Sequence, residues 1–112
     1  MGGRESEGAR PSAEVSLPVV LRKEAQEEFD EAFDYYNAWR TGLGSKFLAA
    51  VEQVFLRISQ FPRMHPIAMA DVRKGVVRRF PYCVYYRPHA DRIEVIAVFC
   101  TKRDPSIWQN RI

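Results

Sequence analysis

The spacing of the apolar residues changes from a helical to a strand period near the middle of the chain. Between Glu24 and Arg40, large apolar side chains recur at steps of three and four residues, and the same spacing resumes between Leu43 and Phe61. Such steps place the apolar side chains on one face of a helix. From Val72 onward, polar and apolar residues tend to alternate, which is typical of strands. Two helices followed by a run of strands favour an α+β fold.

The two predicted helices are separated by Thr41-Gly42-Leu43-Gly44, and the second ends before Pro62. Glycine is common just past the end of a helix, and proline cannot continue one because it lacks a backbone N–H. A connection this short favours an antiparallel pair of helices. Since each helix carries one apolar stripe, we expect both stripes to form core rather than a ligand site.

The remaining segments predict a small, mostly antiparallel sheet. Strands are expected over residues 72–79, 82–87 and 92–101, with a loop over 63–70, and the last strand should be central because it is apolar almost throughout. A first strand within residues 15–21 should lie at a sheet edge, since Pro18 cannot donate to a ladder. Asp104 and Pro105 are typical of the start of a short last helix. The predicted fold is therefore an N-terminal strand, an antiparallel helical hairpin on one face of the sheet, and a short C-terminal helix.

Length and composition predict one globular domain over residues 15–112, preceded by a disordered arm over residues 1–14. The arm has no apolar region of the kind a signal peptide needs, and no apolar run is long enough to span a bilayer. Two cysteines do not make a disulfide framework, so we expect a cytoplasmic protein. His65 and His89 lie in separate predicted loops, so we assign no metal, and nothing predicts a cofactor.

Charge is divided between the two halves of the chain. Residues 24–61 hold seven acidic and three basic side chains, whereas residues 72–112 hold nine basic and three acidic ones. A basic half of this size favours a polyanion or an acidic protein as partner over ordinary surface charge.

A strand register that pairs Arg87 with Arg92 would turn Tyr85, Arg87, Arg92 and Cys100 toward an open face of the sheet, with Ala97 and Phe99 toward the helices. Further basic residues lie near these in sequence: Arg73, Arg78, Arg79, Lys102 and Arg103. Arginines with an interleaved aromatic residue can bind phosphates and stack on a base. The same residues are common on a solvated sheet face, and composition alone does not decide between these two interpretations.

Several short motifs, in order and spacing, cover about four-fifths of the chain. They are Glu24-Ala25-Gln26-Glu27-Glu28, Tyr35-Tyr36, Leu43-Gly44 with Phe47, Phe61-Pro62, Val77-Arg78-Arg79-Phe80-Pro81-Tyr82, Val84-Tyr85-Tyr86-Arg87, Val95-Ile96-Ala97-Val98-Phe99, and Arg103-Asp104-Pro105 with Trp108. With this arrangement the chain resembles the RelE/ParE superfamily of toxins, often called plasmid stabilisation proteins. The resemblance implies the fold predicted above and the toxin role of a bacterial type II toxin–antitoxin pair. It also implies a cognate antitoxin as partner, in a hetero-oligomer.

The family resembled here divides into two functional branches. One branch looks like ribosome-dependent endoribonucleases that cut messenger RNA, for which the catalytic candidates are Arg78, Arg79, Tyr85 and Arg103. The other resembles inhibitors of DNA gyrase, which act by binding and need no catalytic group. Under either reading, the binding candidates are Arg73, Arg87, Arg92, Cys100 and Lys102.

One position departs from the family pattern. Relatives with the Arg-Asp-Pro ending commonly carry histidine where this chain has Cys100. Histidine moves protons near neutral pH, whereas a cysteine thiol ordinarily does not. The acid–base set therefore looks incomplete, which leaves it uncertain whether the chain is an enzyme. We favour the gyrase-type branch, with the ribonuclease and a degenerate member that only binds its antitoxin as the alternatives.

Overall fold

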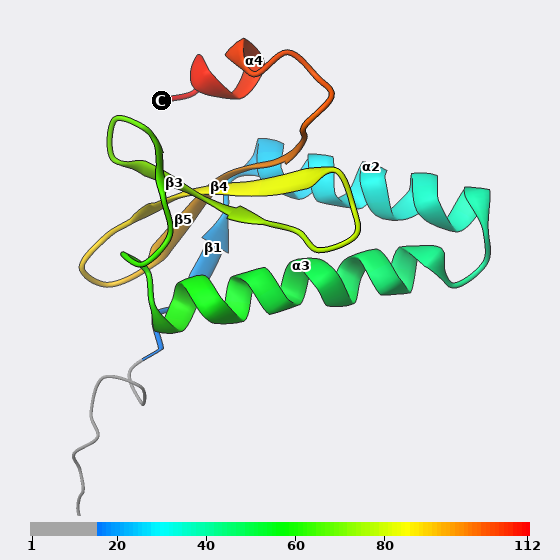
Figure 1. Cartoon of the computed structure of the whole chain (residues 1–112), viewed down its shortest axis with the longest axis horizontal. Helices are drawn as coiled ribbons and strands as arrows, with labels where there is room; N and C mark the ends of the chain where they lie inside the picture. The colour runs from blue at the N-terminus through cyan, green and yellow to red at the C-terminus, as the bar shows by residue number, and fades with distance from the viewer. Residues whose placement is uncertain (1–15) are drawn as a thin grey trace, which may run out of the picture.

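The computed structural model describes residues 16–112, so the predicted arm over residues 1–14 lies outside the described part. Its elements are β1 (Val19–Leu21), α2 (Lys23–Trp39), α3 (Leu43–Gln60), β2 (Ile67–Met69), β3 (Val72–Val76), β4 (Tyr82–Pro88), β5 (Ile93–Cys100) and α4 (Ser106–Gln109). The hairpin of α2 and α3 runs along one side of the sheet, and α4 lies on the other side (Figure 1). This arrangement confirms the predicted α+β fold.

The turn between α2 and α3 depends on two glycines. Gly42 has a φ of +87°, a left-handed conformation that other residues seldom adopt. A Cβ atom on Gly44 would lie 2.7 Å from the carbonyl oxygen of Phe33, so the two helices approach closely there. The backbone N–H of Gly44 also donates to Asn37 Oδ1 at 2.8 Å. These contacts fix the antiparallel hairpin that the sequence predicts.

The five strands lie in the order β1-β5-β4-β3-β2. β1 pairs with β5 in parallel, and the other neighbouring strands are antiparallel. The predicted edge position of the first strand and the predicted central position of the last are both confirmed. β5 is central because its side chains are buried on both faces of the sheet.

Two predicted boundaries were wrong. Residues 63–70 were expected to be a loop, but Ile67–Met69 form the edge strand β2, whose three residues are too few to show an alternating pattern. The strand expected to reach Arg79 ends at Val76. The chain then turns, and the N–H of Val77 donates to the carbonyl oxygen of Tyr82 at 3.0 Å. Arg79 has a φ of +71°, which an extended strand does not allow.

The predicted register between the last two strands was also wrong. Arg87 pairs with Glu94 rather than Arg92, and the register shifts by one residue between Tyr85 and Tyr86. Such a bulge sets two residues of one strand against one of its partner and reverses the alternation of side chains beyond it. Ala97 and Phe99 therefore pack on the α4 side of the sheet, not against the helical hairpin as expected.

Two hydrophobic clusters hold the layers together. The larger lies between the hairpin and the sheet, where Phe47, Val51, Val54 and Ile58 of α3 are fully buried. The smaller lies under α4, where the Trp108 ring stacks on Tyr85 with the centroids 4.0 Å apart. The face that was predicted to be open is thus covered by the C-terminal helix. That helix begins one residue later than expected, and Asp104 Oδ1 accepts the N–H of Ser106 at 3.0 Å.

An ion pair closes the edge of β5 beyond the end of β1. Arg111 contacts Glu28 of α2 at 2.7 Å, and their side chains are only 14% and 11% exposed. Glu28 also accepts the backbone N–H of Val98, and Arg111 donates to the carbonyl oxygen of Ile96. The pair therefore satisfies backbone groups that a sheet edge would otherwise leave open.

Candidate functional site: a basic–aromatic cleft

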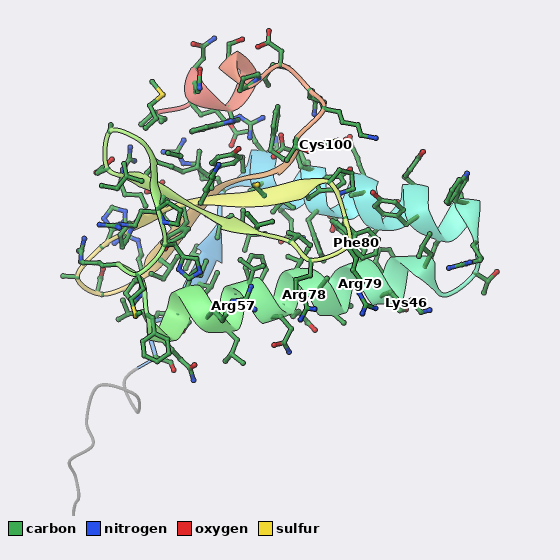
Figure 2. The ribbon with its side chains drawn as sticks, in the orientation of Figure 1. Lys46, Arg57, Arg78, Arg79, Phe80 and Cys100 are labelled. Atoms are coloured by element: carbon green, nitrogen blue, oxygen red, sulfur yellow. The ribbon has the colours of Figure 1, made fainter. Side chains whose placement is uncertain are left out.

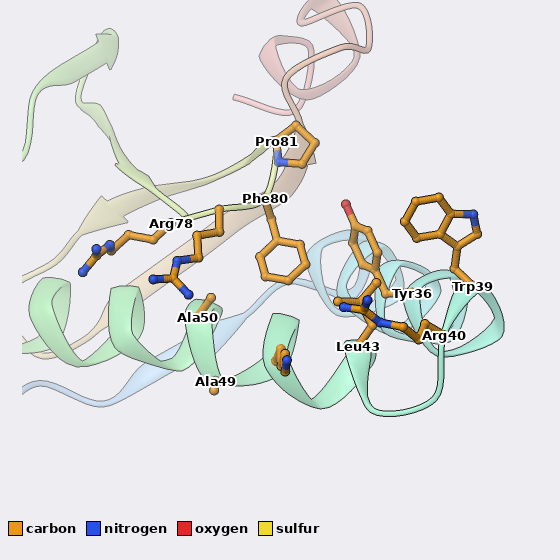
Figure 3. Close-up of a pocket in the computed structure, with 11 residues that line it drawn as sticks. Tyr36, Trp39, Arg40, Leu43, Ala49, Ala50, Arg78, Phe80 and Pro81 are labelled. Carbon is orange, nitrogen blue, oxygen red and sulfur yellow. The ribbon is translucent and has the colours of Figure 1, made fainter.

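A cleft of 790 Å³ lies between the helical hairpin and the turn that joins β3 to β4. It is lined by Tyr36, Trp39, Arg40, Leu43, Lys46, Ala49, Ala50, Arg78, Arg79, Phe80 and Pro81. In the close-up, Arg78 and Trp39 lie toward opposite ends, with Phe80 and Tyr36 between them (Figure 3). Cations and aromatic rings therefore share one concave surface.

The aromatic floor of the cleft is held by the core. The Phe80 ring meets Tyr36 and Phe47 edge-on, with centroid distances of 5.0 and 5.2 Å. Edge-to-face contacts of this kind stabilise aromatic clusters beyond the burial of area alone. Because Phe80 is anchored in this way, the preceding turn places Arg78 and Arg79 over α3, on the same side as Lys46 (Figure 2).

A second hollow of 440 Å³ continues the surface past Pro81. It shares Tyr36, Trp39 and Pro81 with the first, and it adds Tyr35, Tyr82, Cys100, Lys102 and Arg103. We refer to the lining of both hollows together as the basic–aromatic cleft. Within it, the two most exposed aromatic side chains are Trp39, at 76%, and Tyr35, at 61%.

The cations of this cleft differ from the four arginines that form ion pairs within the described residues. Arg22, Arg87, Arg92 and Arg111 each contact a carboxylate. Among the described residues, no carboxylate pairs with the six cleft cations, which are Arg40, Lys46, Arg78, Arg79, Lys102 and Arg103. No Asp or Glu lines either hollow. The cleft therefore concentrates positive charge that these residues do not neutralise.

The structure brings together five of the nine residues singled out in the sequence. Arg78, Arg79, Cys100, Lys102 and Arg103 line the cleft. The guanidinium of Arg103 lies 5.0 Å from the centroid of the Phe99 ring, a cation–π contact. Cys100 was expected on the face away from the helices, but it pairs with Tyr82 and lines the hollow beside α2. The bulge in β5 reverses the alternation of its side chains and so turns Cys100 toward α2.

The other four lie elsewhere, so the expectation of one shared open face was wrong. Tyr85 lies beneath Trp108, and Arg73 donates to the carbonyl oxygens of Arg63 and His65. Arg92 pairs with its neighbour Asp91 in the turn before β5.

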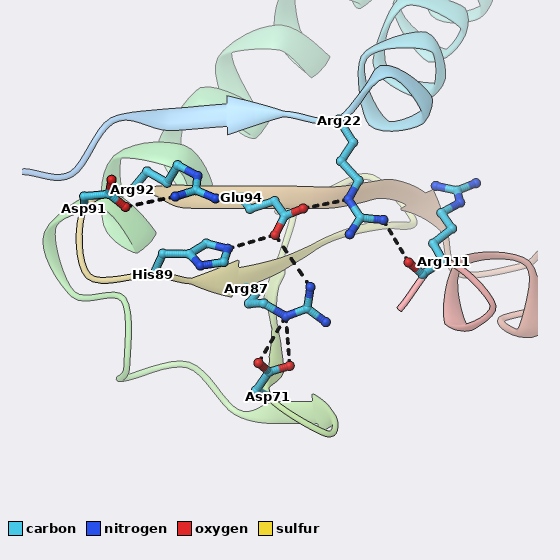
Figure 4. A network of polar contacts seen from close by, with 8 residues as sticks. All are labelled: Arg22, Asp71, Arg87, His89, Asp91, Arg92, Glu94 and Arg111. Atoms are coloured by element: carbon cyan, nitrogen blue, oxygen red, sulfur yellow. Dashed lines mark hydrogen bonds and ion pairs between the residues drawn. The ribbon is translucent and has the colours of Figure 1, made fainter.

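Arg87 belongs to a network centred on Glu94 (Figure 4). It contacts Asp71 at 2.9 Å and Glu94 at 3.6 Å, and Glu94 also contacts Arg22 at 2.7 Å and His89 at 2.8 Å. Burial alone would raise the pKa of Glu94, but hydrogen bonds from His89 and Arg22 and the nearby positive charges lower it to about 2. The contacts tie strands together, so this network is structural.

Two phenols of the cleft, those of Tyr36 and Tyr82, are suited to donating hydrogen bonds rather than accepting protons. Burial, with the neighbouring Cys100 and Tyr36, raises the pKa of Tyr82 to about 12, and burial likewise raises that of Tyr36. Both phenols therefore keep their protons at neutral pH. Neither histidine lines the cleft, and within residues 16–112 no group of His, Cys, Asp and Glu side chains is placed to hold a metal ion. The arrangement can bind anions and planar rings, but it offers no evident general base.

Sequence reasoning missed most of the residues that line the cleft. Tyr36 and Trp39 were interpreted as part of an apolar stripe, and Arg40, Lys46 and Tyr35 were given no role. The sequence did contain one signal for an exposed aromatic residue. Adjacent helical residues such as Tyr35 and Tyr36 point in different directions, so both cannot face the hydrophobic core of the protein.

Comparison with known proteins identifies a family and a fold. A family model described as the ParE toxin of the type II toxin–antitoxin system parDE matches residues 19–105. No curated protein matches the chain significantly. A solved chain of the chromosomal ParDE TA system from P. aeruginosa is 15% identical, with a TM-score of 0.64, and the match covers 74% of this chain and 94% of that one. At this identity the likeness shows a shared fold. None of the helices in residues 16–112 is long and apolar enough to cross a membrane.

Proposed function

The chain belongs to the ParE toxin family of type II toxin–antitoxin systems, as its sequence resemblance implies, and from this premise we propose that it inhibits growth by binding an essential target of the DNA gyrase type. In this proposal the toxin acts in the cytoplasm. A cognate antitoxin neutralises it by forming a hetero-oligomer.

The observation that carries this proposal is the basic–aromatic cleft, with its six cations and no carboxylate in its lining. Cations held beside exposed aromatic rings, such as Trp39, are the side chains that dominate many binding surfaces. An inhibitor that acts by binding needs such a surface and no reactive group.

Binding is favoured over ribonuclease chemistry by the separation of the catalytic candidates. Cleavage of a phosphodiester needs an acid–base group and cations on the same reacting phosphate. Tyr85 instead packs under Trp108, on the sheet face opposite the helical hairpin, whereas Arg78 and Arg79 lie over α3. Burial also raises the pKa of Tyr85 to about 12. The candidates therefore do not form one active site.

The experiment is induced expression of the chain in bacteria, alone and together with the product of the neighbouring gene. We expect growth arrest that the neighbour relieves, with DNA synthesis falling before protein synthesis in pulse-labelled cells. Cleaved messenger RNA with an early fall in protein synthesis would instead support the ribonuclease. Normal growth with folded protein present would contradict both the gyrase-type inhibitor and the ribonuclease. It would support a degenerate family member that only binds its antitoxin.

A pair of variants links arrest to the cleft. Arg78→Gln should weaken arrest because it removes an unpaired cation from the lining. Arg63→Gln removes the same charge from an exposed residue beyond the opposite end of α3, so it should arrest growth as the wild type does. If both variants arrested growth equally, the cleft would not be responsible for toxicity.

A further inference from the structure

We infer that the basic–aromatic cleft binds single-stranded DNA, with bases stacked on its aromatic rings and phosphates on its cations. The inference deepens the proposed function, because DNA held by a gyrase-type target would then meet the toxin directly. It rests on that function only for its biological role, since DNA binding can be measured without any target protein.

The charge of the lining selects a polyanion. Four cations line the larger hollow and two more line the smaller one, and neither contains a carboxylate. Four arginines outside the cleft, Arg22, Arg87, Arg92 and Arg111, pair with carboxylates, whereas no ion pair among the described residues involves a cleft cation. The concave surface therefore gathers six cations whose charge these residues do not neutralise. A groove with such charge follows a sugar–phosphate backbone and releases its counterions on binding.

Aromatic rings in the cleft provide faces for bases. Trp39 and Tyr35 lie one helical turn apart on α2 and are mostly exposed, while Tyr36 and Phe80 form the floor between them and the turn cations. Exposed aromatic rings beside cations are the platform on which unpaired bases stack, with little dependence on sequence. A duplex offers no free base faces, so the cleft fits a single strand better.

The cleft is less suited to an acidic peptide. An extended peptide gains much of its affinity from main-chain hydrogen bonds to an open strand edge. The lining of the larger hollow comes from α2, α3 and their connection and from the turn over residues 78–81, with no strand residue among it. Positive charge without a strand edge favours phosphates over a peptide backbone.

The same lining favours DNA over RNA. Proteins that select RNA form hydrogen bonds to its 2′-hydroxyl groups. The larger hollow contains no carboxylate, amide or aliphatic hydroxyl side chain, and much of its floor is apolar. A 2′-hydroxyl buried there could accept from the cations, but the Tyr36 phenol is the only side chain of the larger hollow that could accept its proton. Deoxyribose avoids the cost of leaving that O–H without an acceptor.

The test is fluorescence anisotropy of a labelled, mixed-sequence oligonucleotide of about 12 nucleotides, titrated with the full chain made by cell-free synthesis. Competitors are the matching duplex, RNA of the same sequence, and polyglutamate. We expect the single-stranded DNA to bind more tightly than all three, with an affinity that falls steeply as salt increases.

Three variants separate stacking from charge. Trp39→Ala should weaken binding roughly tenfold without changing the salt dependence, because it removes a stacking face. Arg79→Asn removes one cation, and asparagine tolerates the left-handed backbone at this position. The variant should reduce the slope of log affinity against log salt by about 0.7. Arg63→Gln, which lies beyond the C-terminal end of α3 and outside the cleft lining, should bind as the wild type does.

Tighter binding of duplex, RNA or polyglutamate would overturn the inference, as would unchanged binding by both Trp39→Ala and Arg79→Asn. A chain that arrests growth but does not bind single-stranded DNA would overturn this inference alone. A chain that binds single-stranded DNA but never arrests growth would overturn the proposed function alone.

Discussion

Replacing Glu94 by Gln tests whether Arg87 belongs to a structural network rather than to a binding surface. The carboxylate of Glu94 contacts Arg22 of the β1–α2 connection, Arg87 of β4 and His89 of the following turn. Glutamine keeps the size of the side chain but removes its negative charge. The variant therefore isolates the electrostatic part of the network.

The magnitude follows from the pKa of Glu94, which falls from 4.5 to about 2 in the folded protein. A shift of this size corresponds to about 3 kcal/mol at full strength. Because the network is partly exposed to solvent, screening reduces this to roughly 1–2 kcal/mol. A carboxylate with a lowered pKa contributes its stability above its unfolded pKa, and this contribution is lost as the pH falls toward its folded pKa.

The assay is urea unfolding at pH 7, 5 and 3, followed by the fluorescence of the buried Trp108. We expect Glu94→Gln to be less stable than the wild type at pH 7, with the difference shrinking between pH 5 and pH 3. Asp91→Asn is the control, because Asp91 is 77% exposed and its pair with Arg92 should contribute below about 1 kcal/mol. A Glu94→Gln protein as stable as the wild type at pH 7 would refute the structural role.

Three further substitutions test other parts of the structure. Tyr85→Phe should leave growth arrest intact because the side chain is covered by the C-terminal helix, and loss of arrest in folded protein would revive a catalytic role. Arg111→Met should lower the free energy of unfolding by about 3 kcal/mol because it leaves the buried Glu28 carboxylate without its partner. A urea midpoint equal to that of the wild type would contradict this. Gly75→Ala should lower the free energy of unfolding by about 1–3 kcal/mol in the same assay, because its Cβ would lie 2.6 Å from Val54 Cγ1. Unchanged stability would show that α3 can move away from β3 without cost.

The fold could be predicted from sequence because its signals are local. The helical period, the glycines at the turn and Pro62 fix the hairpin, and continuous apolar character marks β5 as the central strand. The bulge in β5 could not be predicted in this way, since its one extra residue leaves no pattern in the sequence. That single residue displaced Cys100 from its expected face and moved Ala97 and Phe99 under α4.

The candidate site was only partly predictable because it joins segments that are distant in sequence. Arg78 and Arg79 were found as part of a basic run, whereas Trp39 and Lys46 gain meaning only when the β3–β4 turn folds over the helices. The presence of an arginine in the sequence does not indicate its role. Arg87 forms ion pairs with carboxylates, whereas Arg79 forms no ion pair with any carboxylate among the described residues. Pairing of charges is a property of the folded chain.

The most direct test of the central claim is negative supercoiling of relaxed plasmid DNA by purified DNA gyrase in the presence of the purified full chain. We predict that the wild type and Arg63→Gln inhibit supercoiling, whereas Arg78→Gln and Arg79→Asn, which remove cleft cations, inhibit it weakly. Uninhibited supercoiling with folded wild-type protein would contradict a gyrase-type target. Equal inhibition by all four proteins would contradict the role of the cleft.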